Sequence, residues 1–156
     1  MRHLPYREGT WFAVPLSDGE YALGIVARIG QRGVTLGYFF GPRRRVLPTL
    51  EEIEGLSPGD AAFVGIFGDL GLIKGRWPII GRDAAWDPRR WAMPAFGRIE
   101  EATGRAFRVE YDDVNLPRVQ REVPATRAEV ERLPKEGVAG YGFIEAKLTR
   151  LLSERS

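Results

Sequence analysis

Cysteine is absent from this chain of 156 residues, and histidine occurs only once, as His3. No disulfide can therefore form, and a reducing compartment is permitted. Zinc sites are built chiefly from cysteine and histidine clusters, and Ser-His-Asp or Cys-His catalysis requires a histidine beside the nucleophile. His3 lies close to a terminus, which is commonly held loosely. The sequence thus predicts no metal site, no bound cofactor and no histidine-dependent catalysis.

Long apolar runs are also missing. No stretch approaches the roughly 20 apolar residues that a membrane-spanning helix needs. The opening residues, MRHLPYREGTW, contain no apolar core, so we expect no secretory signal. Together these absences lead us to expect a cytoplasmic protein.

Positive charge comes mainly from arginine, because lysine occurs only at Lys74, Lys135 and Lys147. The formal net charge of +2 is too small for a surface that is cationic throughout. The charges instead form patches: three consecutive arginines precede residues 46–70, which contain acidic residues and no basic ones. These patches supply charged candidates for a partner-binding surface: Arg43, Arg44, Arg45, Glu51, Glu52, Glu54, Asp60 and Asp69.

Length and composition favour one globular domain. Apolar residues make up 44% of the chain and charged residues 28%, which are ordinary values for a globular protein. A domain of this length buries about two-thirds of its unfolded surface and needs no disulfide. We expect a sheet-rich body over about residues 9–111 and a helical C-terminal part over about residues 125–154.

Residues 10–40 predict a β-meander around which the rest of the chain is organised. Apolar residues alternate along its three runs, which are residues 11–16, 21–29 and 34–40. In the central run, the alternation places Ile29 on the face of Ile25, and Arg28 on the face of Val26. Both faces of this run are largely apolar, so we expect other elements to cover each of them.

Two turns join the three runs. Asp18 and Gly19 form the first turn, and such a pair between apolar runs is typical of a hairpin in which both residues have positive φ. Residues 30–33 form the second turn, with glycine at both ends.

Further strands are predicted after the meander. Residues 61–67 read as a buried strand, and residues 72–73 as the start of a short return strand. Pro78 cannot donate to a strand ladder, so residues 75–81 should lie at a sheet edge or a bulge. Residues 96–101 and 106–111 predict a second hairpin of the same sheet, followed by a polar connection through residues 112–124.

Three helices complete the expected fold. Thr49 with Glu52, and Thr126 with Glu129, form capping-box patterns at the starts of two short helices. An amphipathic C-terminal helix of about four turns is indicated by apolar residues at helical spacing, namely Tyr141, Ile144, Leu148 and Leu151. The predicted class is α+β, with a strongly bent, mostly antiparallel sheet. The sequence does not decide between an open sheet and a barrel-like one.

Aromatic residues allow a second interpretation. Residues 82–94 predict a long loop in which Trp86 and Trp91 fold back on the body, and these two rings join the candidate partner-binding residues. Exposed rings beside arginines bind single-stranded nucleic acid through stacking and phosphate contacts. The aromatic residues considered for this alternative are Tyr38, Phe39, Trp77, Trp86 and Trp91, with Arg89 and Arg90 among the cations. With so small a net charge, we favour core packing for the rings.

Adjacent carboxylates give a third interpretation. Asp112 and Asp113 are the pair considered for a carboxylate mechanism, which needs two acids a few ångströms apart in a pocket. Adjacent acids at a turn are usually solvated, so we expect no catalytic residues and no enzyme.

The order of two motifs resembles a known family. The stretch GTWFAVPLSDGEYALGIVARIG is similar to the start of the bacterial immunity protein 26 family, and GLIKGRWPIIGRDAAW with the later Pro94, Ala95 and Phe96 is similar to its second block. The two blocks cover about residues 9–111, and residues 112–156 match nothing in that pattern. The resemblance implies a non-catalytic immunity protein of a polymorphic toxin system, which neutralises a cognate protein toxin by occlusion.

Overall fold

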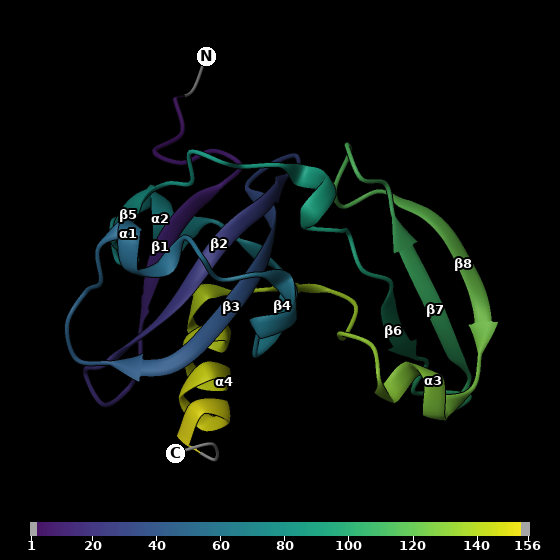
Figure 1. The fold of residues 1–156 in the computed structure, drawn as a ribbon. Helices are drawn as coiled ribbons and strands as arrows, with labels where there is room; N and C mark the ends of the chain where they lie inside the picture. The colour runs from purple at the N-terminus through teal and green to yellow at the C-terminus, as the bar shows by residue number, and fades with distance from the viewer. Residues whose placement is uncertain (1–2, 154–156) are drawn as a thin grey trace.

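The computed structural model describes residues 3–153, which form two β-sheets surrounded by short helices (Figure 1). Strands β1 (Thr10–Pro15), β2 (Tyr21–Ile29) and β3 (Val34–Arg44) form the predicted antiparallel meander. They lie at the centre of a six-stranded sheet in the order β5-β1-β2-β3-β4-β9. The outer strands are β4 (Phe63–Gly68), β5 (Ile79–Arg82) and β9 (Val138–Ala139). As Pro78 predicts, β5 lies at an edge and pairs with β1 through an irregular register.

The two turns of the meander differ in conformation. The prediction of positive φ at both Asp18 and Gly19 is wrong, because only Gly19 has it, at 87°. Leu16 donates its backbone N–H to Glu20 at 2.7 Å, and this bond closes a three-residue loop that ends in glycine. In the second turn Arg32 and Gly33 both have positive φ, at 56° and 79°.

Both faces of the six-stranded sheet are covered, as the apolar pattern of β2 predicts. One face buries Trp11, Leu23, Ile25 and Phe40 against residues of the second sheet. The opposite face packs rings and aliphatic side chains beneath helix α4 (Tyr141–Ser153), among them Phe12, Val26, Phe39, Phe67, Trp77, Ile144 and Leu148. The meander is therefore interior scaffold.

The second sheet is a separate meander of β6 (Phe96–Ile99), β7 (Ala106–Tyr111) and β8 (Val119–Ala125). The second hairpin is thus correctly predicted as a hairpin, but it does not belong to the first sheet. Strand β8 replaces part of the predicted polar connection. Most of its residues are exposed, so no buried row of apolar side chains marks it in the sequence.

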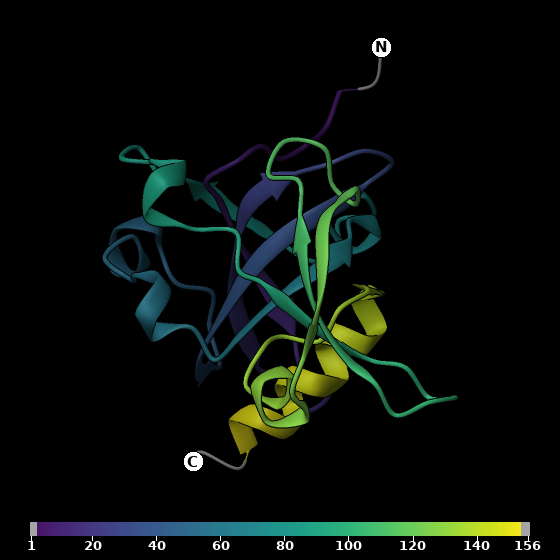
Figure 2. The same cartoon turned by 90° about the vertical axis from the view of Figure 1, so that its right-hand side faces the viewer.

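The chain between α3 (Arg127–Glu131) and α4 joins the two sheets. Gly97 in β6 donates to Pro134 and accepts from Glu136, both at 2.8 Å. A few residues on, β9 pairs in parallel with Ile66 and Phe67 of β4. We call residues 134–139 the bridging segment. Its course from the second sheet to the first is visible in Figure 1, and the rotated view places the second sheet in front of the larger one (Figure 2).

The helices follow the predicted caps. Helix α1 (Leu50–Ile53) has the capping box of Thr49 and Glu52, and the Thr126 hydroxyl accepts from the Glu129 backbone N–H at 3.1 Å. The expected return strand after β4 is wrong, because this segment forms helix α2 (Leu70–Ile73). Two short 3-10 helices lie at Pro58–Asp60 and Pro88–Arg90.

The fold class is α+β with mostly antiparallel sheets, as predicted. Among the described residues the larger sheet is open, since it ends in the edge strands β5 and β9. Within residues 3–153, no helix is both long and apolar enough to span a membrane.

Candidate functional site

The predicted acidic residues differ in burial, because four are exposed and Asp69 is buried. Glu51 and Glu52 are exposed on α1, and Glu54 is exposed just after it. Glu52 also accepts from the backbone N–H and hydroxyl of Thr49 at 3.2 and 3.1 Å. Asp69 is only 7% exposed and accepts a 2.6 Å hydrogen bond from the Tyr6 hydroxyl. Asp69 therefore lies inside the fold, while the glutamates of α1 lie on the surface.

Asp60 is the fourth exposed residue among the five acidic candidates. The backbone N–H and hydroxyl of Ser57 donate to it at 2.9 and 3.0 Å, and these bonds hold the pKa of the Asp60 carboxyl below its usual value. Asp60 thus remains negatively charged at neutral pH.

The arginine cluster is partly neutralised by the first hairpin turn. Arg43 forms ion pairs with Asp18 and Glu20, and Arg45 lies 3.4 Å from Glu20. Arg44 is half-buried, whereas the Arg45 side chain is 90% exposed. The register of the β2–β3 hairpin accounts for these ion pairs. Tyr21 pairs with Arg44, so Glu20, next to Tyr21, lies near Arg43 and Arg45. Asp18 and Glu20 are the partners that the sequence reasoning missed.

Four of these charged groups, Asp18, Glu20, Arg43 and Asp60, line a surface cavity of about 640 Å³. Its lining residues come from the first hairpin turn, the end of β3, the segment after α1 and the end of α4: Asp18, Glu20, Gly41, Pro42, Arg43, Asp60 and Leu152. The cavity brings acidic and basic side chains together and places them beside α4.

The tryptophans of the 82–94 loop fold back on the body, as predicted. Trp91 is 3% exposed and packs edge-on against Tyr38 and Phe40, with ring centroids 5.2 and 6.1 Å away. Trp86 is half-buried and stacks on Trp91 at 6.0 Å. Trp77, on the opposite side of the sheet, stacks on Phe12 at 5.4 Å. These rings are predominantly packing residues.

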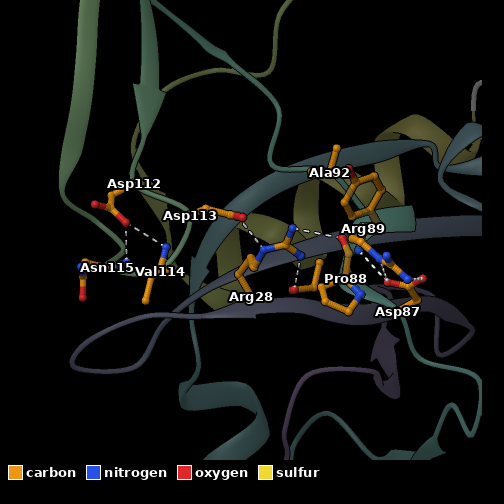
Figure 3. A network of polar contacts seen from close by, with 11 residues as sticks. Arg28, Asp87, Pro88, Arg89, Ala92, Asp112, Asp113, Val114 and Asn115 are labelled. Carbon is orange, nitrogen blue, oxygen red and sulfur yellow. Dashed lines mark hydrogen bonds and ion pairs between the residues drawn. The ribbon is translucent and has the colours of Figure 1, made fainter.

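Arg28 forms a polar link between β2 and the loop that follows β7 in the second sheet (Figure 3). A β-bulge at Ala27 shifts the register, since Val26 pairs with Gly37 but Arg28 pairs with Leu36. A bulge of this kind redirects the following side chain. Arg28 consequently points to the second sheet, and Ile29 packs with the opposite core, which corrects the predicted faces of both residues.

The Arg28 guanidinium is held on three sides. It donates to the Asp113 carboxylate at 2.6 Å, to the Ala27 carbonyl at 2.7 Å and to the Pro88 carbonyl at 3.1 Å. The neighbouring Asp112 turns away in Figure 3 and accepts from the backbone N–H groups of Val114 and Asn115, which lowers the pKa of its carboxyl. Each carboxylate is thus engaged in its own structural contact, and the two do not converge on a shared substrate position.

Within residues 3–153, no cluster of three or more His, Cys, Asp or Glu side chains is arranged to hold a metal ion.

The fold and these surfaces define an α+β protein of two mostly antiparallel sheets, with charged patches around an aromatic interior. Residues 7–108, about two-thirds of the chain, match the family described as Immunity protein 26, and the chain belongs to that family. The family is one of immunity proteins in toxin systems, so the predicted resemblance is confirmed. The match extends from β1 into β7 and leaves out β8, α3, β9 and α4. No curated protein and no solved structure matches the chain.

Proposed function

We propose that this protein binds a cognate protein toxin in the cytoplasm and neutralises it by covering the toxin's active site, without catalysis of its own. The observation that carries this proposal is the match of residues 7–108 to the Immunity protein 26 family. Exposed charge supports a protein partner, because complementary charges speed association and reject wrong partners.

The proposed contact surface is the charged area around α1 and the end of β3. It contains the exposed members of the candidate set, which are Arg45, Glu51, Glu52, Glu54 and Asp60. Arg43 and Arg44 lie beside it at half-buried positions, and Trp86 and Trp91 pack in the core cluster that contains Ile53 of α1. Asp69 is bonded to Tyr6 inside the fold and does not belong to the surface. An acidic surface of this kind suits a toxin whose active site is basic.

Burial of the rings favours a protein partner over single-stranded nucleic acid. Phe39, Trp77 and Trp91 are 0%, 1% and 3% exposed, and a base can stack only on an exposed ring.

The test uses the toxin domain encoded beside the gene of this protein. Co-expression should restore growth of cells that make the toxin, and the purified proteins should bind in titration calorimetry. Glu51→Lys and Glu54→Lys, singly and together, should weaken binding several-fold at low salt and less at high salt. Glu101→Lys, an exposed charge reversal on the second sheet, is the control. If the unmodified protein neither binds the toxin nor protects cells, the proposed function is wrong.

A further inference from the structure

Strand β4 has an open edge over half its length. It pairs with β3 along its whole length, but on the other side β9 pairs only with Ile66 and Phe67. Within the described chain, no strand pairs with that side of residues 63–65. The bridging segment does not pair with them, because it crosses to Gly97 in the second sheet.

Backbone groups along this edge are oriented for a further strand. Asp69 donates its N–H to Gly33 at 2.9 Å, and the Thr35 hydroxyl donates to the Phe67 carbonyl at 2.8 Å, so Phe67 and the alternate residues Gly65 and Phe63 direct their backbone groups toward β3. Backbone groups alternate in direction along a strand, so the N–H and carbonyl of Val64 face away from β3. An unpaired edge of this kind is a template for an added strand, and proteins usually protect such edges.

An apolar groove of about 590 Å³ lies against this edge. Helix α4 and the bridging segment form its other walls, and most of its lining side chains are apolar: Ala62, Phe63, Ile66, Leu133, Pro134, Val138, Phe143 and Leu151. Phe143 is 57% exposed and Val138 is 50% exposed. Large apolar side chains gathered at such exposure are typical of an interaction site.

The charged residues at the groove are mainly basic. Lys135 and Lys147 both line it, and the Lys147 ammonium lies 5.3 Å from the centre of the Phe63 ring. Glu136 is the acidic residue in the lining, and it already accepts a 3.0 Å hydrogen bond from Tyr111. Two of the chain's three lysines therefore favour an occupant that carries negative charge.

We propose that this groove receives an extended segment of the toxin, with apolar side chains and at least one acidic residue, which adds to β4 as a further strand. In this mode the backbone supplies affinity and the pockets between alternate side chains supply specificity. The inference rests on the proposed function and assigns a second contact surface to it. Leu151 lines the groove and Leu152 lines the cavity that contains Asp60, so one toxin can reach both surfaces across the end of α4.

The first test compares matched variants in titration against the toxin domain encoded beside the gene. Phe143→Ser and Lys147→Glu should each weaken binding about 10-fold, as expected for central interface residues. Val114→Ser, at a site 78% exposed, and Lys74→Glu, whose ammonium lies over Tyr141 outside the groove, should bind as the unmodified protein does. Equal melting temperatures would show that all four variants fold.

The second test uses hydrogen exchange of the unmodified protein with and without the toxin. The amide of Val64 should become protected in the complex. If the toxin binds but this amide stays unprotected and the groove variants bind normally, this inference is wrong while the proposed function stands. If the toxin does not bind at all, both are wrong. Protection that appears without toxin, together with elution at twice the chain mass, would assign the groove to self-association and overturn the inference.

Discussion

Arg28 is the residue at which local alternation and tertiary structure disagree most. Strand periodicity places its side chain with Val26, yet the bulge at Ala27 turns it toward the second sheet. A bulge depends on the pairing of two strands, so the alternation within one strand does not reveal it.

Replacing Arg28 should therefore weaken the junction between the sheets. Arg28→Met keeps the apolar part of the side chain but leaves the Ala27 and Pro88 carbonyls without their donor, which should lower the free energy of unfolding by about 2 kcal/mol. Asp113→Asn should cost less than about 1 kcal/mol, because the Asp113 side chain is 57% exposed. Urea unfolding of both variants checks this, and an equal loss for the two would contradict it.

Glu145 gives the fold a dependence on acid pH. Burial alone would raise the pKa of Glu145, but hydrogen bonds from Arg76 and Trp77 and the charge of Arg76 together lower it. The bonds are 2.6 and 2.7 Å from Arg76 and 3.0 Å from the Trp77 indole N–H. Because the pKa is lower in the folded state, this contribution is present above the ordinary glutamate pKa and is lost as the pH falls through the folded value.

Glu145→Gln should consequently destabilise the protein most at neutral pH. We expect a loss of about 1–2 kcal/mol at pH 7, because Gln cannot accept the charged hydrogen bonds equally well. The difference from the unmodified protein should shrink below the ordinary glutamate pKa of 4.5. Urea unfolding across this pH range measures it, and a difference independent of pH would argue against the ionised carboxylate.

At the scale of elements, α4 shows what helical periodicity predicts well and where it is imprecise. The helix and its buried residues Ile144 and Leu148 follow from spacing alone. The third buried residue is Leu152, whereas Leu151, the predicted one, is half-buried. Which residue faces inward at the end of the helix depends on how the helix lies on the sheet.

Truncating these leucines should reproduce that difference. Leu148→Ala removes a side chain with 0% exposure and should cost about 3 kcal/mol of unfolding free energy through lost burial and a cavity. Leu151→Ala should cost about 1 kcal/mol, because its side chain remains partly in solvent. Thermal or urea denaturation measures the two losses of stability. A larger loss for Leu151→Ala than for Leu148→Ala would mean that Leu151 faces the core, as the helical spacing predicts.

Strand β8 and helix α2 were missed for different physical reasons. Strand β8 lies at the edge of the small sheet, so it lacks the buried alternating side chains that make a strand recognisable. Helix α2 is a single turn whose Leu72 packs beside Trp77, and so short an apolar run suits a strand equally well.

For the whole molecule, the bridging segment and the shared core favour one cooperative unit. Residues 134–139 pair with both sheets, and Phe96, Val109 and Tyr111 of the second sheet pack with Trp11 and other core residues of the first. We therefore predict a single unfolding transition. Far-UV circular dichroism and tryptophan fluorescence should give coincident curves. Two separated transitions would instead divide the chain into two domains.

The sequence by itself determined the α+β class, the meander, the caps of α1 and α3, and the family, because these depend on turns, alternation and capping within short stretches. Four candidate acids at the surface, Glu51, Glu52, Glu54 and Asp60, were also indicated by local charge. The tertiary structure alone decided that the second hairpin forms its own sheet, that Asp69 is interior, and that β4 keeps an open edge. These outcomes depend on which distant segments pair and pack, and no pattern within a single segment specifies that choice.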